Sequence, residues 1–145
     1  MSTLYFAYGS NLDAAQMLDR CPDAVLVGPA ELPRHRLAFV GYSFAWGGAV
    51  ATVEPDPQHR VPGLVYALTA RDVATLDRVE AHPVVYQRRA IHVRLDGAMR
   101  RVQTYVHTSD EAGDPAPGYL RKIRNAYKRH RFDATVLDAA LLVAA

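Results

Sequence analysis

Short apolar runs bounded by Gly, Pro and Asp follow one another along most of the chain and predict strands. The first covers residues 4–8, is rich in aromatic side chains and ends at Gly9. Similar runs predict strands over residues 24–28, 35–40, 49–54 and 63–68. Two further runs, 86–95 and 101–107, flank Asp96-Gly97, a strong hairpin signal.

Apolar positions at helical spacing predict four helices between and after these strands. The first begins at Ser10, which forms a capping box with Asp13, and the second covers residues 70–81 with Thr69 as its cap. The last two cover about 119–129 and 134–143. Strands outnumber helices and mostly neighbour one another, so we expect one α+β domain over residues 1–145, with a mixed, curved or barrel-like sheet and flanking helices.

Composition narrows the class of protein. Half of the 145 residues are hydrophobic and 22% are charged, which is typical of a globular domain. A net charge of +2 gives no indication of nucleic-acid binding, and no apolar stretch is long enough to cross a bilayer. Cys21 is the single cysteine, which excludes an internal disulfide. With no export signal, we expect a cytoplasmic protein without a membrane partner; the oligomeric state is not readable.

Two places along the chain are candidates for chemistry. The turn at Gly9 leaves backbone N–H groups unpaired, which favours a carboxylate or a developing oxyanion, although on geometry alone an ordinary turn capped by Ser10 is the better interpretation. Glu80 lies on the same helical stripe as Leu76, just before His82-Pro83 ends the helix. Burial and the helix C-terminus both raise the pKa of such a carboxyl toward that of a general base.

The alternative for Glu80 is a structural ion pair with Arg88 or Arg89. For the tyrosines of this region the alternative is simple core packing.

Four segments together resemble the γ-glutamylcyclotransferases, over residues 5–127. The match includes a family departure, because Ala81 stands where members often have Gly directly after the catalytic Glu. The segments are Tyr8-Gly9-Ser10-Asn11, Gly47 to Val53, Val61 to Tyr66, and Leu76 to Glu80 followed by Tyr86 and Arg88.

This resemblance implies a reaction and a set of site residues. The α-amine of a γ-glutamyl group attacks its own γ-carbonyl, giving 5-oxoproline and a free amine or amino acid, with Glu80 as general acid and base. Because the nucleophile belongs to a small-molecule γ-glutamyl substrate, no cofactor and no metal are expected. The leaving group stays open. The implied substrate-binding residues are Tyr5, Tyr8, Gly9, Ser10, Asn11, Tyr105 and Tyr119.

Other kinds of site have weaker signals. The six histidines lack metal-binding spacing, Ser10 lacks the G-x-S-x-G pattern, and Cys21 has no motif around it. The basic run 121–131 is compatible with a nucleic-acid or acidic-partner binding module, but Leu120, Ile123 and Tyr127 make an apolar stripe through it. A non-catalytic γ-glutamyl or small-anion binder on the same fold is the remaining alternative, and it does not need Glu80.

Overall fold

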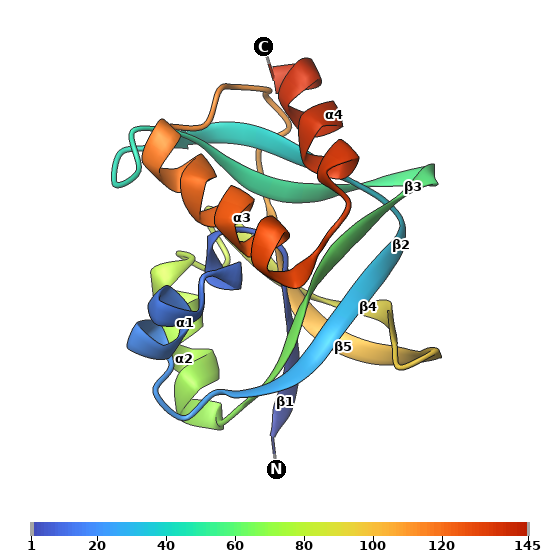
Figure 1. Ribbon diagram of the computed structural model, residues 1–145. Coiled ribbons are helices and arrows are strands. Elements are labelled where there is room, and N and C mark those ends of the chain that lie inside the picture. The colour runs from blue at the N-terminus through green and yellow to red at the C-terminus, as the bar shows by residue number, and fades with distance from the viewer. Residues whose placement is uncertain (1, 145) are drawn as a thin grey trace.

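Within residues 2–144, which the computed structural model describes, five strands close into a barrel in the order β1-β3-β2-β4-β5 (Figure 1). The strands are β1 (Thr3–Ala7), β2 (Val25–Ser43), β3 (Gly48–Leu68), β4 (Tyr86–Leu95) and β5 (Ala98–His107). The helices are the short 3₁₀ turn η1 (Ser10–Leu12), α1 (Ala14–Arg20), α2 (Ala70–Val79), α3 (Pro117–His130) and α4 (Ala134–Ala144).

The sheet is mixed, as expected. β1 pairs antiparallel with β3 and meets β5 in parallel, at Tyr5 opposite Gln103, which closes the barrel. The other pairs are antiparallel, including β4 and β5, which are joined through the predicted Asp96-Gly97 turn. The α+β fold class and the barrel-like sheet are therefore confirmed.

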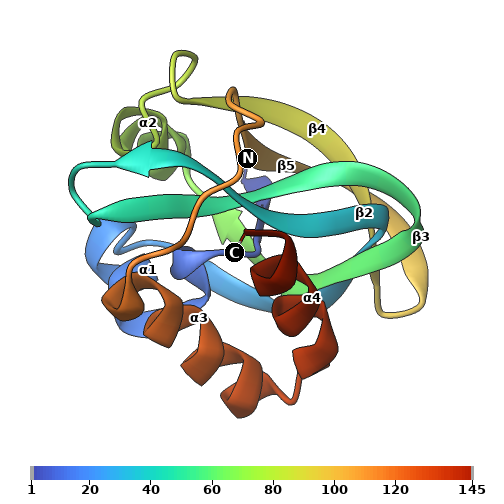
Figure 2. The same ribbon diagram turned by 90° about the horizontal axis from the view of Figure 1, so that it is seen from above.

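The prediction of four separate strands between residues 24 and 68 was wrong. They form two long strands, β2 and β3, paired along their length. The prolines that interrupt the sequence pattern do not end the strands, because register shifts at Leu26/Gly28 and at Pro33/His35 absorb irregular backbone within a continuous ladder. The two long strands bend and form one side of the barrel before running on toward the C-terminal helices (Figure 2).

The helices cover the outside of the barrel. α1 and α2 lie together near one end, whereas α3 crosses in front and α4 packs on the upper part of β2 (Figure 1). In α3, Ile123 and Tyr127 are buried, and Leu120 packs partly buried against the same core. Two basic residues of this helix have acidic neighbours, Lys122 with Asp13 at 3.4 Å and Arg124 with Asp138 at 3.8 Å. The basic side chains of the run 121–131 thus lie mostly on the outer face of the amphipathic helix α3, and acidic neighbours compensate part of their charge.

Cavities lie between the strands and the helices that cover them. The main cavity, of about 480 Å³, lies between the β1–η1 turn, the tip of the β2–β3 hairpin and the end of α2. The α4 cavity, of about 250 Å³, lies between β2, β3 and α4. In the described range none of the helices combines the length and the apolar character that crossing a membrane requires.

Candidate active site

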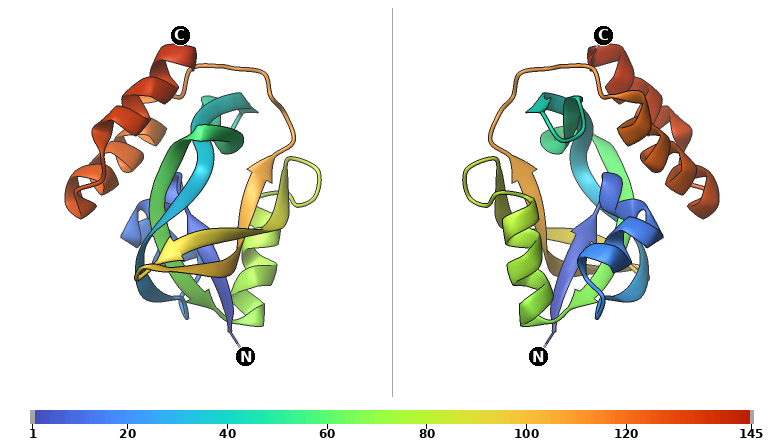
Figure 3. Two further views of the ribbon diagram at one scale, coloured as in Figure 1. Left: turned by 90° about the vertical axis from the view of Figure 1, so that its right-hand side faces the viewer. Right: turned by 90° about the vertical axis from the view of Figure 1, so that its left-hand side faces the viewer.

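The eight residues singled out from the sequence all line the main cavity. The elements that carry them are β1 with the turn after it, η1, the C-terminus of α2, β5 and α3 (Figures 1 and 3). The fold thus brings together positions from opposite ends of the chain. The eight are Tyr5, Tyr8, Gly9, Ser10, Asn11, Glu80, Tyr105 and Tyr119.

The turn after β1 differs from the prediction in its cap. Ser10 does not cap a helix but begins η1, and its hydroxyl accepts a hydrogen bond from the side chain of Gln16 at 2.8 Å. Asp13 caps α1 instead, with its carboxylate accepting from the Gln16 backbone N–H at 2.9 Å. The sequence pattern placed the helix start three residues early because it did not anticipate the intervening 3₁₀ turn.

The backbone N–H groups of Gly9, Ser10 and Asn11 make no hydrogen bond to the described part of the chain. The unpaired donors foreseen in the sequence are therefore present at the cavity wall. Gly9 has a negative φ of −113°, so its role is not a left-handed turn. A Cβ at this position would lie 3.2 Å from the Ala51 Cβ and 3.4 Å from the Tyr119 hydroxyl. Glycine here keeps the turn close against the opposite wall.

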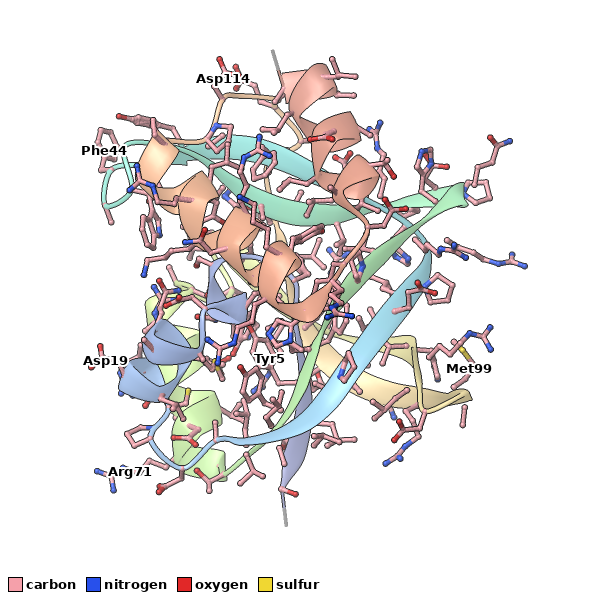
Figure 4. All side chains as sticks on the ribbon, in the orientation of Figure 1. Tyr5, Asp19, Phe44, Arg71, Met99 and Asp114 are labelled. Atoms are coloured by element: carbon pink, nitrogen blue, oxygen red, sulfur yellow. The ribbon has the colours of Figure 1, made fainter. Side chains whose placement is uncertain are left out.

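Asn11 is the centre of a hydrogen-bond network that links the turn to other parts of the site. Its Nδ2 donates to the Tyr5 hydroxyl at 3.0 Å. Its Oδ1 accepts from Gln16 at 3.1 Å and from Arg20 Nη1 at 3.0 Å. Figure 4 shows Tyr5 at the centre of the molecule, between α1 and the barrel. Asn11 is committed to this network and holds the wall of the cavity in place.

Arg20 extends the network to the carboxylate. The same Nη1 lies 3.8 Å from Glu80 Oε1, and both side chains are largely buried. Arg20 was missed in the sequence, where it stands in the last turn of α1 without any motif around it. Only the packing of α1 beside α2 makes it a neighbour of Glu80.

Glu80 occupies the C-cap of α2, immediately after the helix that Thr69 caps as predicted, with the Thr69 hydroxyl accepting from the Asp72 N–H at 3.1 Å. The helix ends in a Schellman motif: His82 N–H donates to Asp77 O at 2.8 Å and Ala81 N–H to Arg78 O at 3.1 Å. Ala81 takes the left-handed position of this motif, with φ of 51°. A glycine at this position fits the same geometry without strain.

The electrostatics of Glu80 are those of a poorly compensated carboxyl. Burial raises its pKa from 4.5 to about 7, and Arg20 opposes this effect only in part. The alternative interpretation of Glu80, an ion pair with Arg88 or Arg89, is wrong. Arg88 lies 3.3 Å from Asp77, and Arg89 donates to Gln87 at 2.9 Å. Arg88 and Arg89 therefore have other partners, and the cation beside Glu80 is Arg20.

The tyrosine hydroxyls divide into two kinds. Tyr8 donates to the Tyr105 carbonyl, and Tyr105 donates to Asp77 at 2.6 Å, so both protons are engaged inside the protein. The Tyr5 hydroxyl accepts from Asn11, and that of Tyr119 accepts from the Ala51 N–H at 2.8 Å. These two keep a proton to donate to a ligand. Burial raises the pKa of all four phenols, which remain neutral donors.

Burial shifts two other candidate groups, Cys21 and His107, toward their neutral forms. Cys21 is fully buried, and burial raises the pKa of its thiol to about 12. Burial lowers the pKa of His107, which lines the cavity as a neutral ring. Among residues 2–144 no group of three or more His, Cys, Asp or Glu side chains is arranged to hold a metal ion.

Comparison with known proteins gives a consistent result. The family described as "Gamma-glutamyl cyclotransferase, AIG2-like" matches residues 5–122. The gamma-glutamylcyclotransferase of Mus musculus is 32% identical, in a match that covers 83% of this chain and 67% of that protein. The gamma-glutamylaminecyclotransferase of Bos taurus is 31% identical, in a match that covers 53% of this chain and 58% of that protein.

A solved structure of a protein named "Gamma-glutamyl cyclotransferase" superimposes with a TM-score of 0.88 at 27% identity, covering 97% of this chain and 86% of the other. The likeness thus extends from the sequence to nearly the whole fold. The chain belongs to the gamma-glutamyl cyclotransferase, AIG2-like family.

Proposed function

We propose that the protein converts a γ-glutamyl amide to 5-oxoproline and a free amine by intramolecular aminolysis, with Glu80 as the general base and then the general acid. The observation that carries this proposal is Glu80 itself: a carboxyl of pKa about 7 on the wall of a cavity, opposite a turn with unpaired N–H donors. A base of this pKa accepts and returns a proton near neutral pH.

The steps assign a task to each part of the site. The ionised Glu80 takes a proton from the substrate α-ammonium, and the free amine attacks the γ-carbonyl carbon to close the five-membered ring. The carbonyl oxygen becomes negative, and donors fixed in advance stabilise it. The carbonyl then re-forms and the amide C–N bond breaks as Glu80 returns the proton to the leaving nitrogen. The ring nitrogen gives up its remaining extra proton, which the released amine takes up as an ammonium. The net reaction consumes no water and no co-reactant.

The donors available for the glutamyl oxygens are the N–H groups of Gly9, Ser10 and Asn11 and the hydroxyls of Tyr5 and Tyr119. Arg20 provides the positive charge for the substrate α-carboxylate or for Glu80. The network around Asn11 holds these groups in position before the substrate binds. The conformational entropy of these groups is therefore lost on folding and not on substrate binding.

The test is to incubate the purified protein with a set of γ-glutamyl amides and amino acids and to detect 5-oxoproline by mass spectrometry. Formation of 5-oxoproline that persists in excess chelator supports the proposal. Activity that chelator abolishes and zinc or magnesium restores contradicts it.

The same assay on Glu80→Gln separates an enzyme from a binding protein. Loss of product formation with retained binding of 5-oxoproline, measured by calorimetry, supports catalysis by Glu80. Binding of γ-glutamyl compounds without any product from the wild-type protein favours the non-catalytic alternative.

A further inference from the structure

Exposed apolar side chains gather around the mouth of the main cavity. Tyr42, 58% exposed, lies at the end of β2, and Phe44, 94% exposed, lies on the β2–β3 turn. Val79 and Val85, 44% and 40% exposed, lie at the end of α2 and on the segment after it. All four line the cavity. Large apolar side chains left open to water and concentrated around one hollow are typical of a ligand-binding surface.

The turn that carries the aromatic residues is held in place from several sides. Within it, Gly47 N–H donates to Ser43 O at 2.7 Å and Trp46 N–H to the Ser43 hydroxyl at 3.2 Å. The Trp46 ring packs edge-on against Tyr119 with centroids 5.0 Å apart. Phe44 extends from the tip, away from the body of the barrel (Figure 4). Trp46 thus joins the outer apolar wall to a tyrosine of the proposed glutamyl subsite.

The charged side chains that the structure describes on the cavity wall match the charges of the glutamyl group and leave no cation for a further carboxylate. Among the described residues that line it, Arg20 and Glu80 are the charged side chains, and His107 is neutral. The glutamyl end of a substrate brings one carboxylate and one ammonium, which match these two. A second carboxylate, as in a leaving amino acid, finds no cation and is placed between apolar walls that desolvate it.

We infer, resting on the proposed function, that the leaving group is an arylalkyl amine without a carboxylate, whose ring lies between the aromatic turn at Tyr42–Trp46 and the segment at Val79–Val85. The glutamyl group occupies the polar interior, and the amide bond lies where the two parts meet, beside Glu80. This arrangement assigns specificity for the leaving group to the β2–β3 turn.

Three synthetic substrates separate the two parts of this inference: the γ-glutamyl derivatives of phenethylamine, of phenylalanine and of ethylamine. The first two differ by one carboxylate, and the first and third by one aromatic ring. We expect kcat/KM for the phenethylamine compound to exceed each of the others by about tenfold or more, the usual scale for one buried apolar group or one unmatched charge. A phenylalanine or ethylamine compound turned over equally well or better overturns the inference.

Variants of the turn connect the preference to its residues. Phe44→Ala should lower the phenethylamine-to-ethylamine ratio of kcat/KM by about three- to tenfold, mainly through KM, which is the scale of one aromatic contact. Phe44→Lys should raise kcat/KM for the phenylalanine compound relative to the phenethylamine compound, because it supplies the missing cation. Leu142→Ala is the matched control, since this side chain is 79% exposed on α4, outside the cavity, and should change neither ratio.

The outcomes also distinguish this inference from the proposed function. If all three compounds yield 5-oxoproline but Phe44→Ala leaves their ratios unchanged, the reaction stands and the aromatic subsite is wrong. If none of the three yields 5-oxoproline while γ-glutamylalanine does, the inference also fails and the proposed function holds. If no γ-glutamyl compound reacts, both fail.

Discussion

In the α4 cavity, Arg36 donates two hydrogen bonds to Glu54, at 2.7 and 3.1 Å, and His59 lies 3.0 Å from Asp56. In the main cavity, the single cation beside Glu80 is Arg20, at 3.8 Å and already hydrogen-bonded to Asn11, as far as the structure of residues 2–144 describes it. Both cavities contain carboxylates of the same kind. The two cavities differ in whether the carboxylate has a cation within direct hydrogen-bonding distance.

This difference distinguishes a carboxylate that contributes to stability from one whose pKa suits proton transfer. A carboxylate bonded directly to an arginine keeps its charge at neutral pH and contributes to stability. A carboxylate that is buried with a more distant cation is costly to ionise, and its pKa rises, to about 7 for Glu80. That cost is useful only at a site where a proton must be taken and given back.

Replacing each carboxylate by its amide gives the largest contrast. We expect Glu80→Gln to reduce kcat by about two to four orders of magnitude, the usual scale for loss of a general base, and to leave stability unchanged or about 1 kcal/mol higher. Glu54→Gln should retain activity and lose about 1 kcal/mol, because it weakens a charge-assisted pair that is partly exposed. Product formation and thermal melts on both variants measure the contrast. A Glu80→Gln protein that unfolds readily, with normal activity per folded molecule, defeats the catalytic role.

The pH dependence of stability tests the same carboxylate without a substrate. Folding raises the pKa of Glu80 from 4.5 to about 7, so the folded state binds more protons than the unfolded state between these values. The free energy of unfolding of the wild-type protein should therefore fall as pH rises through this window, by roughly 1–3 kcal/mol, and level off above it. The difference between wild type and Glu80→Gln in urea titrations isolates this contribution. A difference that stays constant from pH 4.5 to 7 shows that Glu80 has an ordinary pKa.

Gly9 tests the opposite wall of the main cavity, where the turn after β1 lies close to Ala51 and Tyr119. Gly9→Val should raise KM by about tenfold to a hundredfold and weaken 5-oxoproline binding to match, because a side chain at this position displaces Ala51 or Tyr119, 3.2 and 3.4 Å from the added Cβ. Gly118→Val is the control, since a Cβ there meets nothing within 4 Å. Circular dichroism establishes that both variants are folded. Normal kinetics for a folded Gly9→Val protein removes this turn from the binding site.

The sequence predicted features that depend on residues close together in the chain, and it failed for features that depend on residues far apart in the chain. The cap at Thr69, the hairpin turn at Asp96-Gly97 and the helix end beside Glu80 are encoded by residues within a few positions of one another, and the structure contains all three. The fold class followed from the order of such local signals. By contrast, prolines that interrupt β2 and β3 read as strand ends, because a bulge depends on the partner strand and leaves no local signature.

The site followed the same rule. The eight candidate residues came from local turns and from the family resemblance, and they meet at one cavity. Arg20 and the aromatic turn at Tyr42–Trp46 were missed, because an arginine at a helix end and exposed aromatics in a hairpin gain meaning only from what packs beside them. The ion-pair alternative for Glu80 considered only arginines near it in sequence, whereas its neighbour is Arg20.

Removing the cation beside Glu80 should have a smaller effect than removing the carboxylate. Arg20 lowers the pKa of Glu80, so Arg20→Gln should raise it further and move the acidic limb of the kcat/KM profile to higher pH. At pH 7 this reduces kcat/KM by about three- to thirtyfold, part of it through lost binding of the substrate carboxylate. Arg20→Lys keeps the positive charge, so its acidic limb should lie close to that of the wild-type protein. An acidic limb that stays in place in Arg20→Gln shows that the two groups are not coupled.

The smallest expected effect concerns the backbone that holds Glu80. Ala81 adopts a left-handed conformation with φ of 51° at the end of α2, which glycine tolerates without strain. Ala81→Gly should raise the free energy of unfolding by up to about 1 kcal/mol, the left-handed penalty being partly offset by the greater freedom of glycine in the unfolded chain. Because the helix-end hydrogen bonds are made by the backbone, the position of Glu80 and the midpoint of the pH–rate profile should not change. Urea titration measures the first effect and steady-state kinetics the second. If the midpoint moves, the strained alanine takes part in setting the pKa of Glu80, and the contrast between the two cavities extends to the backbone.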